Sequence, residues 1–311
     1  MENTSATKEP SKGLVIAAFT AVYILWGSTY VGIALAIKTI PPFLMAGTRF
    51  FAAGFILYSY CLLSGEKTPD IVSFSKSAFT GLLMLFCGTT GLIWSEQFIP
   101  SGLAAVVIAS VPFWFVLLDR RNWKTNFSDK FTLAGLLVGF TGILLLFNGK
   151  ASFSFYHKAQ LIAFFALLIG SAVWAAGSLY SKYSGAKGST IMLASIQMMA
   201  AGIGGLITSF ISGETTHFTV SSVSMSSIYA MIYLITFGSL IGYIAYIWLL
   251  QVRPPAIVGT YAYVNPVVAM VLGLILNNEM IGGTQIAALV IILSGVLLVN
   301  LSKYKKIQHE K

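Results

Sequence analysis

The sequence predicts an all-α integral membrane protein with ten transmembrane helices, built as two inverted five-helix repeats with both termini cytoplasmic. Three observations carry this prediction: a scarcity of charge, an uneven placement of lysine and arginine, and a similarity of the chain to itself. Only 9% of the 311 residues are charged and 57% are hydrophobic, whereas soluble domains carry about 25% charged residues. This composition excludes a cytosolic enzyme, a nucleic-acid-binding domain and a disordered chain.

The apolar residues fall into long continuous runs, which favour membrane-spanning helices over the short alternating segments of an outer-membrane barrel. One spanning helix needs about 20 residues, so ten helices use about 200 and leave no room for a soluble domain. Pro100 and Gly102 are turn residues and divide one overlong run into the third and fourth spans. The predicted spans are 14–37, 43–63, 77–98, 101–118, 131–148, 159–181, 190–211, 226–250, 256–276 and 284–301.

The lysine and arginine residues indicate the orientation, because cytoplasmic loops of membrane proteins carry an excess of both. With a cytoplasmic N-terminus, 15 of the 19 basic residues fall in inside segments, three (Lys38, Lys150 and Lys158) fall in outside loops, and Arg49 lies within a span. This asymmetry places both termini in the cytoplasm. It also explains the net charge of +9, which needs no nucleic-acid partner.

The chain resembles itself at closely similar offsets between 148 and 154. At an offset of 148, Trp26 falls on Trp174. At 154, a run of matches pairs Gly88, Trp94, Gln97, Pro100 and Pro112 with Gly242, Trp248, Gln251, Pro254 and Pro266. The predicted repeats are residues 1–150 and 151–311. Since each holds an odd number of spans, the second enters from the opposite side of the membrane, an arrangement typical of secondary transporters.

Several of these motifs resemble the EamA family of the drug/metabolite transporter superfamily. The matching motifs are Leu25-Trp26-Gly27-Ser28-Thr29-Tyr30, Pro41-Pro42, Arg49-Phe50, residues 96–105 with Pro112, Pro266, and Asn278-Glu279. The resemblance covers essentially the whole chain and implies a ten-helix transporter of the bacterial cytoplasmic membrane, usually an exporter of amino acids, other metabolites or drugs. One departure is the basic stretch 119–124, which stands where the family has an acidic position before the fifth span.

Polar and aromatic groups inside spans are the candidate substrate-binding residues, because such groups usually face the bundle interior or a water-filled cavity. They would line an amphipathic cavity suited to a neutral or zwitterionic solute. Core packing or anchoring at the membrane surface is the alternative for each single tyrosine or tryptophan. The candidates are Trp26, Ser28, Thr29, Tyr30, Trp94, Trp174, Ser178, Tyr243, Tyr246, Tyr261 and Asn265.

Arg49, Glu96, Pro112 and Pro266 are the candidates for gating or coupling. Arg49 and Glu96 could pair to close the outer side; alternatively, Arg49 reaches the outer interface and Glu96 is simply hydrated. Glu96 is also the most plausible carboxylate for proton coupling. Each proline removes a backbone hydrogen bond and permits a kink, which serves either as a hinge or as a static bend.

The sequence therefore predicts a secondary transporter that moves a small organic metabolite, amino-acid-like or amphipathic, and exports it across the cytoplasmic membrane by alternating access. An uncoupled facilitator or exchanger is the first alternative. A membrane-embedded enzyme is disfavoured because the histidines and carboxylates are scattered and form no catalytic or metal cluster. The expected partners are the solute and the lipid bilayer, with no cofactor, no metal and no nucleic acid, and the chain is expected to act as a monomer or homodimer.

Overall fold

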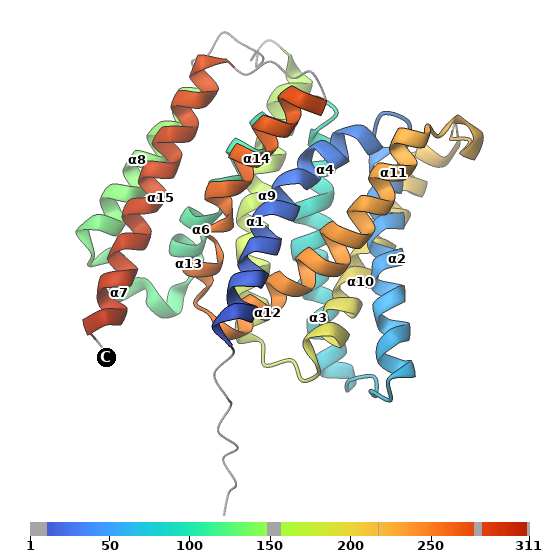
Figure 1. Cartoon of the computed structure of the whole chain (residues 1–311), viewed down its shortest axis with the longest axis horizontal. Helices are drawn as coiled ribbons and strands as arrows, with labels where there is room; N and C mark the ends of the chain where they lie inside the picture. The colour runs from blue at the N-terminus through green and yellow to red at the C-terminus, as the bar shows by residue number, and fades with distance from the viewer. Residues whose placement is uncertain (1–10, 148–156, 217, 277–281, 310–311) are drawn as a thin grey trace, which may run out of the picture.

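The computed structural model describes residues 11–147, 157–216, 218–276 and 282–309, and over these ranges the regular structure is entirely helical. Figure 1 shows the helices gathered into one bundle. The elements of the first half are α1 (Lys12–Ala36), α2 (Pro42–Leu63), α3 (Ile71–Gly81), the π-helical η1 (Leu82–Thr90), α4 (Gly91–Ser95), α5 (Ser101–Ile108), α6 (Val111–Leu118), η2 (Arg120–Asn122), α7 (Trp123–Phe127) and α8 (Lys130–Phe147).

The second half begins after the fifth predicted span and repeats this order of long elements. Its elements are α9 (Lys158–Tyr183), α10 (Thr190–Ile211), η3 (Glu214–Thr216), η4 (Val220–Ser222), α11 (Met225–Tyr233), the π-helical η5 (Leu234–Tyr243), α12 (Ile244–Val252), α13 (Pro255–Val258), α14 (Tyr261–Leu276) and α15 (Gly283–His309). Each of the ten predicted spans overlaps one helix or a series of consecutive helices.

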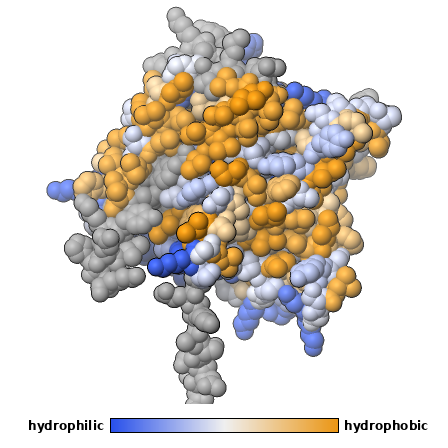
Figure 2. All heavy atoms as spheres, in the orientation of Figure 1, coloured by the Kyte–Doolittle hydropathy of each residue, from blue (hydrophilic) through white to orange (hydrophobic). Residues whose placement is uncertain are grey.

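The outer surface is strongly apolar. Seven helical segments are long and apolar enough to cross a membrane, and three shorter apolar helices (Lys130–Gly142, Val264–Leu276 and Gly283–Gly295) lie where the sequence predicts the fifth, ninth and tenth spans. Figure 2 shows hydrophobic side chains over most of one face, with hydrophilic ones gathered towards its ends. Leu63, Phe210 and Ile211 are examples of large hydrophobic side chains that are exposed on the surface. A surface of this kind suits lipid, and the all-helical membrane architecture predicted from composition is confirmed.

Two pairs of helices from opposite halves pack side by side: α2 on α10, and α8 on α15. The first pair is antiparallel, and carboxylates join its ends. Glu214, just beyond α10, accepts hydrogen bonds from the backbone N–H groups of Phe43 (3.2 Å) and Leu44 (2.9 Å) in the first turn of α2. Glu66, just beyond α2, accepts a hydrogen bond of 2.7 Å from Ser189, which caps α10. A carboxylate at a helix N-terminus meets unpaired N–H groups and the positive end of the helix dipole.

The spans that line the bundle interior are irregular at their middles. The third predicted span contains η1 and the eighth contains η5, and π-helical turns occur frequently at functional sites. The fourth span breaks at Ala109 and Ser110, so that Pro112 stands in the first turn of α6, whereas Pro266 lies inside α14. The predicted bend therefore takes the form of a break before Pro112, and the ninth span breaks earlier, at Gly259 and Thr260.

Gly81, at the end of α3, lies against the backbone of α10, and a Cβ atom there would overlap the carbonyl group of Gln197. Because backbone cannot yield as a flexible side chain can, we expect Gly81→Ala to lower the midpoint of thermal unfolding in detergent by several degrees. Gly91→Ala is the matched control, since a Cβ at helical Gly91 meets no atom within 4 Å. Equal midpoints for the two variants would contradict the close packing of α3 on α10.

Candidate functional site

A cavity of about 70 Å³ lies where α1, α2, η1, α9, η5 and α14 meet. One water molecule needs roughly 10–15 Å³ measured in this way, so the cavity has room for more than one. Its wall is mostly aromatic and aliphatic, with a few polar side chains. The lining residues are Trp26, Thr29, Tyr30, Ile33, Arg49, Phe50, Leu85, Gly88, Thr89, Leu92, Ile108, Val111, Gly170, Ser171, Trp174, Gly238, Ser239, Tyr243, Tyr261 and Asn265.

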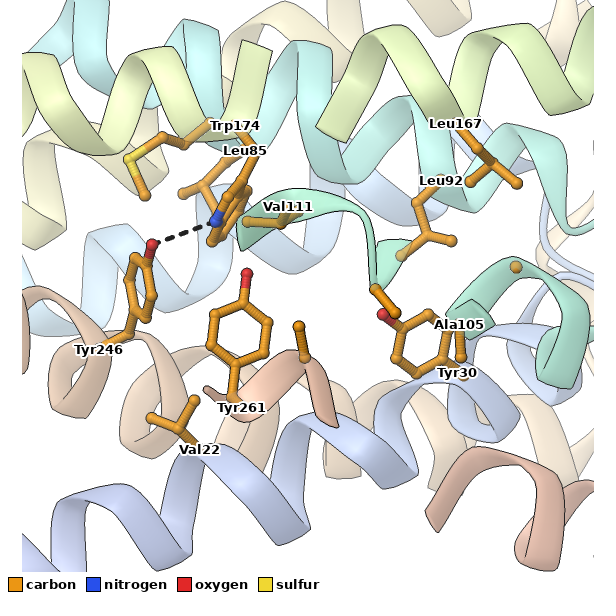
Figure 3. Close-up of a cluster of buried hydrophobic side chains, with 14 of the residues drawn as sticks. Val22, Tyr30, Leu85, Leu92, Ala105, Val111, Leu167, Trp174, Tyr246 and Tyr261 are labelled. Atoms are coloured by element: carbon orange, nitrogen blue, oxygen red, sulfur yellow. Dashed lines mark hydrogen bonds between the residues drawn. The ribbon is translucent and has the colours of Figure 1, made fainter. Parts of the chain in front are cut away.

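The aromatic part of the wall is built around Trp26 from α1 and Trp174 from α9, whose rings meet edge to face with centroids 5.5 Å apart. The ring centroid of Tyr246 lies 4.9 Å from that of Trp26 and 5.5 Å from that of Trp174. Tyr261 packs on Trp26 with ring centroids 5.3 Å apart. Figure 3 shows Tyr246 and Tyr261 side by side, with the hydroxyl of Tyr246 turned towards Trp174. The two tryptophans that the internal alignment pairs therefore meet at the centre of the bundle.

Hydrogen bonds hold these rings in place. The indole Nε1 of Trp26 donates to the carbonyl oxygen of Gly238 in the π-helical η5 (3.1 Å). The indole of Trp174 donates to the hydroxyl of Tyr246 (3.2 Å), which also shares a hydrogen bond of 2.8 Å with Ser178. Satisfied polar atoms and packed rings leave each aromatic face in a fixed position at the cavity wall, which favours binding because little side-chain freedom remains to be lost.

Arg49 supplies the cationic part of the wall. Its side chain is only 4% exposed; Nε donates to the hydroxyl of Ser239 in η5 (3.0 Å), and the guanidinium lies 5.0 Å from the ring centre of Phe50. The structure therefore buries Arg49 in the bundle. Glu96 is also buried, at 8% exposure.

A second, larger cavity of about 420 Å³ lies beside the ends of α3, α9 and α12; Ser77, Lys182, Gln197 and Gln251 are among its lining residues. Tyr243, which lines the central cavity, donates a hydrogen bond of 2.6 Å to Gln197 Oε1. This bond joins η5 to α10. It therefore stands between the wall of the central cavity and the wall of the second one.

The other predicted site residues lie outside the wall of the central cavity. Ser178 and Tyr246 form the layer behind Trp174, and Ser28 hydrogen-bonds to Tyr233 at 2.5 Å. Trp94 packs on Phe98. Neither Glu96, Pro112 nor Pro266 lines the cavity. Glu279, the acidic residue of the family motif, lies outside the residues that the structure describes.

Several wall residues are not among the site residues predicted from the sequence, among them Phe50, Thr89, Ser171 and Ser239. Ser171 and Ser239 are small polar residues inside apolar runs, which is a usable signal; Phe50 belongs to the family motif Arg49-Phe50, and the aliphatic residues carry no signal. Gly88 was found only as a repeat match. Within the described part of the chain, no group of three or more histidine, cysteine, aspartate or glutamate side chains could hold a metal ion.

An all-helical, multi-pass membrane protein with a closely lined cavity at the centre of its bundle has the architecture of a transporter rather than of a soluble enzyme. The particular family follows from comparison with known sequences. The pattern of the EamA-like transporter family matches residues 12–148 and again residues 161–301. The chain belongs to this family, which confirms the resemblance drawn from the motifs.

Individual relatives are named as transporters or efflux pumps. The chain is 39% identical over 293 residues to the "Uncharacterized inner membrane transporter YedA" of Escherichia coli (strain K12), covering 93% of this chain and 92% of the relative. It is 26% identical over 290 residues to the "Probable amino-acid metabolite efflux pump" of Salmonella typhimurium (strain LT2), covering 89% and 91%. A solved crystal structure with 17% identity matches 93% of this chain and 98% of its own with a TM-score of 0.65, and supports the fold alone.

Proposed function

We propose that this chain is a secondary transporter that moves a small organic metabolite, amino-acid-like or amphipathic, and exports it across the cytoplasmic membrane by alternating access. The observation that carries the proposal is the central cavity, to which the paired tryptophans Trp26 and Trp174 contribute one ring each. A cavity lined from both halves of a bundle changes its access when the halves change their packing. The relative named as an efflux pump supports export.

The proposal includes ten spans in two inverted repeats, 1–150 and 151–311, with both termini cytoplasmic. The antiparallel pairing of α2 with α10 supports the inversion, because Glu66 and Glu214 stand at the sequence offset of 148 that relates Trp26 to Trp174. The π-helical segments in the third and eighth spans support it as well. So do the two consecutive matches to the family pattern.

Flux through purified protein in liposomes tests the function. Vesicles preloaded with one solute from a panel of amino acids and amphipathic drugs are expected to take up the same labelled solute by counterflow, at rates well above protein-free vesicles. The panel is run with and without a pH gradient. Absence of counterflow for every solute, with protein shown to be folded by its unfolding midpoint, would contradict the proposal.

Glu96 is the proposed coupling carboxylate, and Glu96→Gln tests it because glutamine keeps the shape and cannot exchange a proton. If export is proton-coupled, a pH gradient stimulates wild-type flux, and Glu96→Gln is expected to lose that stimulation while retaining counterflow. Glu66→Gln is the control, since Glu66 lies outside the predicted spans and binds Ser189. Wild-type flux that ignores the pH gradient would favour the uncoupled facilitator instead.

The Tyr243–Gln197 hydrogen bond is proposed to help keep the central cavity apart from the second one. Tyr243→Phe removes the donor and Gln197→Leu removes the acceptor. Since one such bond contributes about 1 kcal/mol, each variant is expected to raise solute exchange about fivefold, and the double variant to add little more. Additive effects in this double-mutant cycle would show that the bond does not act as a unit.

A further inference from the structure

The guanidinium of Arg49 is poorly satisfied for a cation buried in an apolar bundle. It carries five N–H donors, of which only that on Nε has a hydrogen-bond partner among the described residues. Nη1 is fully buried and has no partner there. A buried donor without a partner is unfavourable, and arginine cannot relieve the situation by losing its proton. The arrangement is that of a binding group awaiting an acceptor.

The acceptor would come from the cavity, because Arg49 lines it. Gly238 provides the space beside the guanidinium of Arg49, because a Cβ atom at this position would lie 2.7 Å from Nη2 and 3.0 Å from the side chain of Thr29. The carbonyl oxygen of Gly238 is already engaged by the indole of Trp26. One glycine therefore sets both the cationic and the aromatic part of the wall.

Taking the proposed transport function as given, we propose that Arg49 binds the carboxylate of the solute, whose apolar or aromatic body packs against Trp26, Trp174 and Tyr261. Guanidinium and carboxylate match geometrically, since two parallel N–H groups meet two oxygens. Arg49 is the one cationic side chain among the lining residues, so it balances one negative charge. A single carboxylate on a largely apolar body is therefore the chemistry that this wall fits.

Binding to purified full-length protein tests this assignment with a matched series of probes: L-phenylalanine, L-phenylalaninamide, 3-phenylpropionate and 3-phenylpropionamide. Binding is measured by displacement of radiolabelled L-phenylalanine and by the shift of the unfolding midpoint. Wild-type protein is expected to bind each acid at least about tenfold more tightly than its amide, the range for a charge-assisted hydrogen bond. The comparison of phenylalanine with 3-phenylpropionate then reports whether the ammonium group contributes.

Arg49→Gln is expected to abolish the preference for acids over amides, with an unfolding midpoint close to wild type because glutamine occupies the equivalent position, Gln197, in the second half. Arg49→Lys should keep part of the preference. Gly238→Ala keeps the guanidinium of Arg49 but displaces it, and should reduce the preference for acids over amides. This variant provides the test if Arg49→Gln fails to fold. Arg120→Gln, at an exposed arginine, is the control and should behave as wild type.

The outcomes separate this inference from the function on which it rests. If acids and amides bind equally to wild type, if no probe binds, or if Arg49→Gln retains the preference, the role of Arg49 is overturned, even where the liposome panel shows flux of another solute. If the acid preference holds and depends on Arg49 but no solute moves across the membrane, the binding site stands and the transport function falls.

Discussion

Trp174→Ala is expected to weaken binding of the transported solute by at least about tenfold, a loss of about 1.4 kcal/mol. The indole of Trp174 forms part of the cavity wall and meets the rings of Trp26 and Tyr246. Aromatic contacts of this kind contribute about 0.5–1.5 kcal/mol beyond the area they bury, and the substitution also removes the donor to Tyr246. Affinity is measured by concentration dependence of counterflow and by direct binding.

Truncating a buried tryptophan can also unfold a protein, at about 3–5 kcal/mol, so Trp174→Phe is measured beside it. Phenylalanine keeps a smaller ring in the wall while losing the indole N–H, and a smaller loss of affinity is expected. Trp123→Ala is the control, because Trp123 is 42% exposed and lies in α7, away from the cavity. Unchanged affinity in Trp174→Ala would show that the aromatic wall does not contribute to solute binding.

Arg49→Met is expected to lower solute flux at least about tenfold while leaving the amount of folded protein near that of wild type. Methionine fills a similar length without charge, and the substitution also removes Nη1, a buried donor that has no partner among the described residues and is therefore unfavourable. The hydroxyl of Ser239 would lose its partner but can bond to its own helix. Flux per folded molecule and the unfolding midpoint are the two measurements.

The combination of results distinguishes three roles for Arg49. Low solute flux with an unchanged unfolding midpoint indicates that Arg49 either binds the solute or forms part of the gate. The preference for acids over amides then distinguishes these two roles. Low flux with a midpoint lowered by many degrees indicates a structural role, which the buried bond to Ser239 (3.0 Å) would then explain. Unchanged flux would contradict both the predicted gate and the carboxylate site.

The general architecture was readable from the sequence because membrane spans are long and their composition is extreme. Seven long apolar helical segments and three shorter ones fall where the ten runs predict them. Which side chains form the cavity wall was harder to predict from the sequence, since apolar runs of this kind carry little periodicity. Whether a given tyrosine faces the cavity, as Tyr261 does, or the layer behind it, as Tyr246 does, depends on helix rotation.

Other features arise only in three dimensions. The π-helical turns η1 and η5 alter the rotation of the residues that follow, and no residue type marks their position. Glu66 and Glu214 lie in the connections that follow α2 and α10, where a carboxylate is usually hydrated, yet each reaches the start of a helix in the other half. Arg49 could be recognised as unusual from its place in a span, but its partner Ser239 lies 190 residues away.

The most direct test of the central claim is the accessibility of the cavity from the two sides of the membrane. Thr89 lines the cavity, and Thr89→Cys is introduced into protein from which Cys61 and Cys87 have been removed. Sided vesicles of both orientations are treated with a charged thiol reagent that does not cross the bilayer. Protein that retains only Cys87, which is exposed on the apolar surface, is the control and should react poorly.

For a transporter that alternates access to one central site, the cysteine at position 89 is expected to react from both sides, and a transported solute is expected to slow the reaction from each. Reaction from one side only, under every solute condition, would contradict alternating access. Equal labelling with and without the transported solute would place the solute elsewhere in the protein.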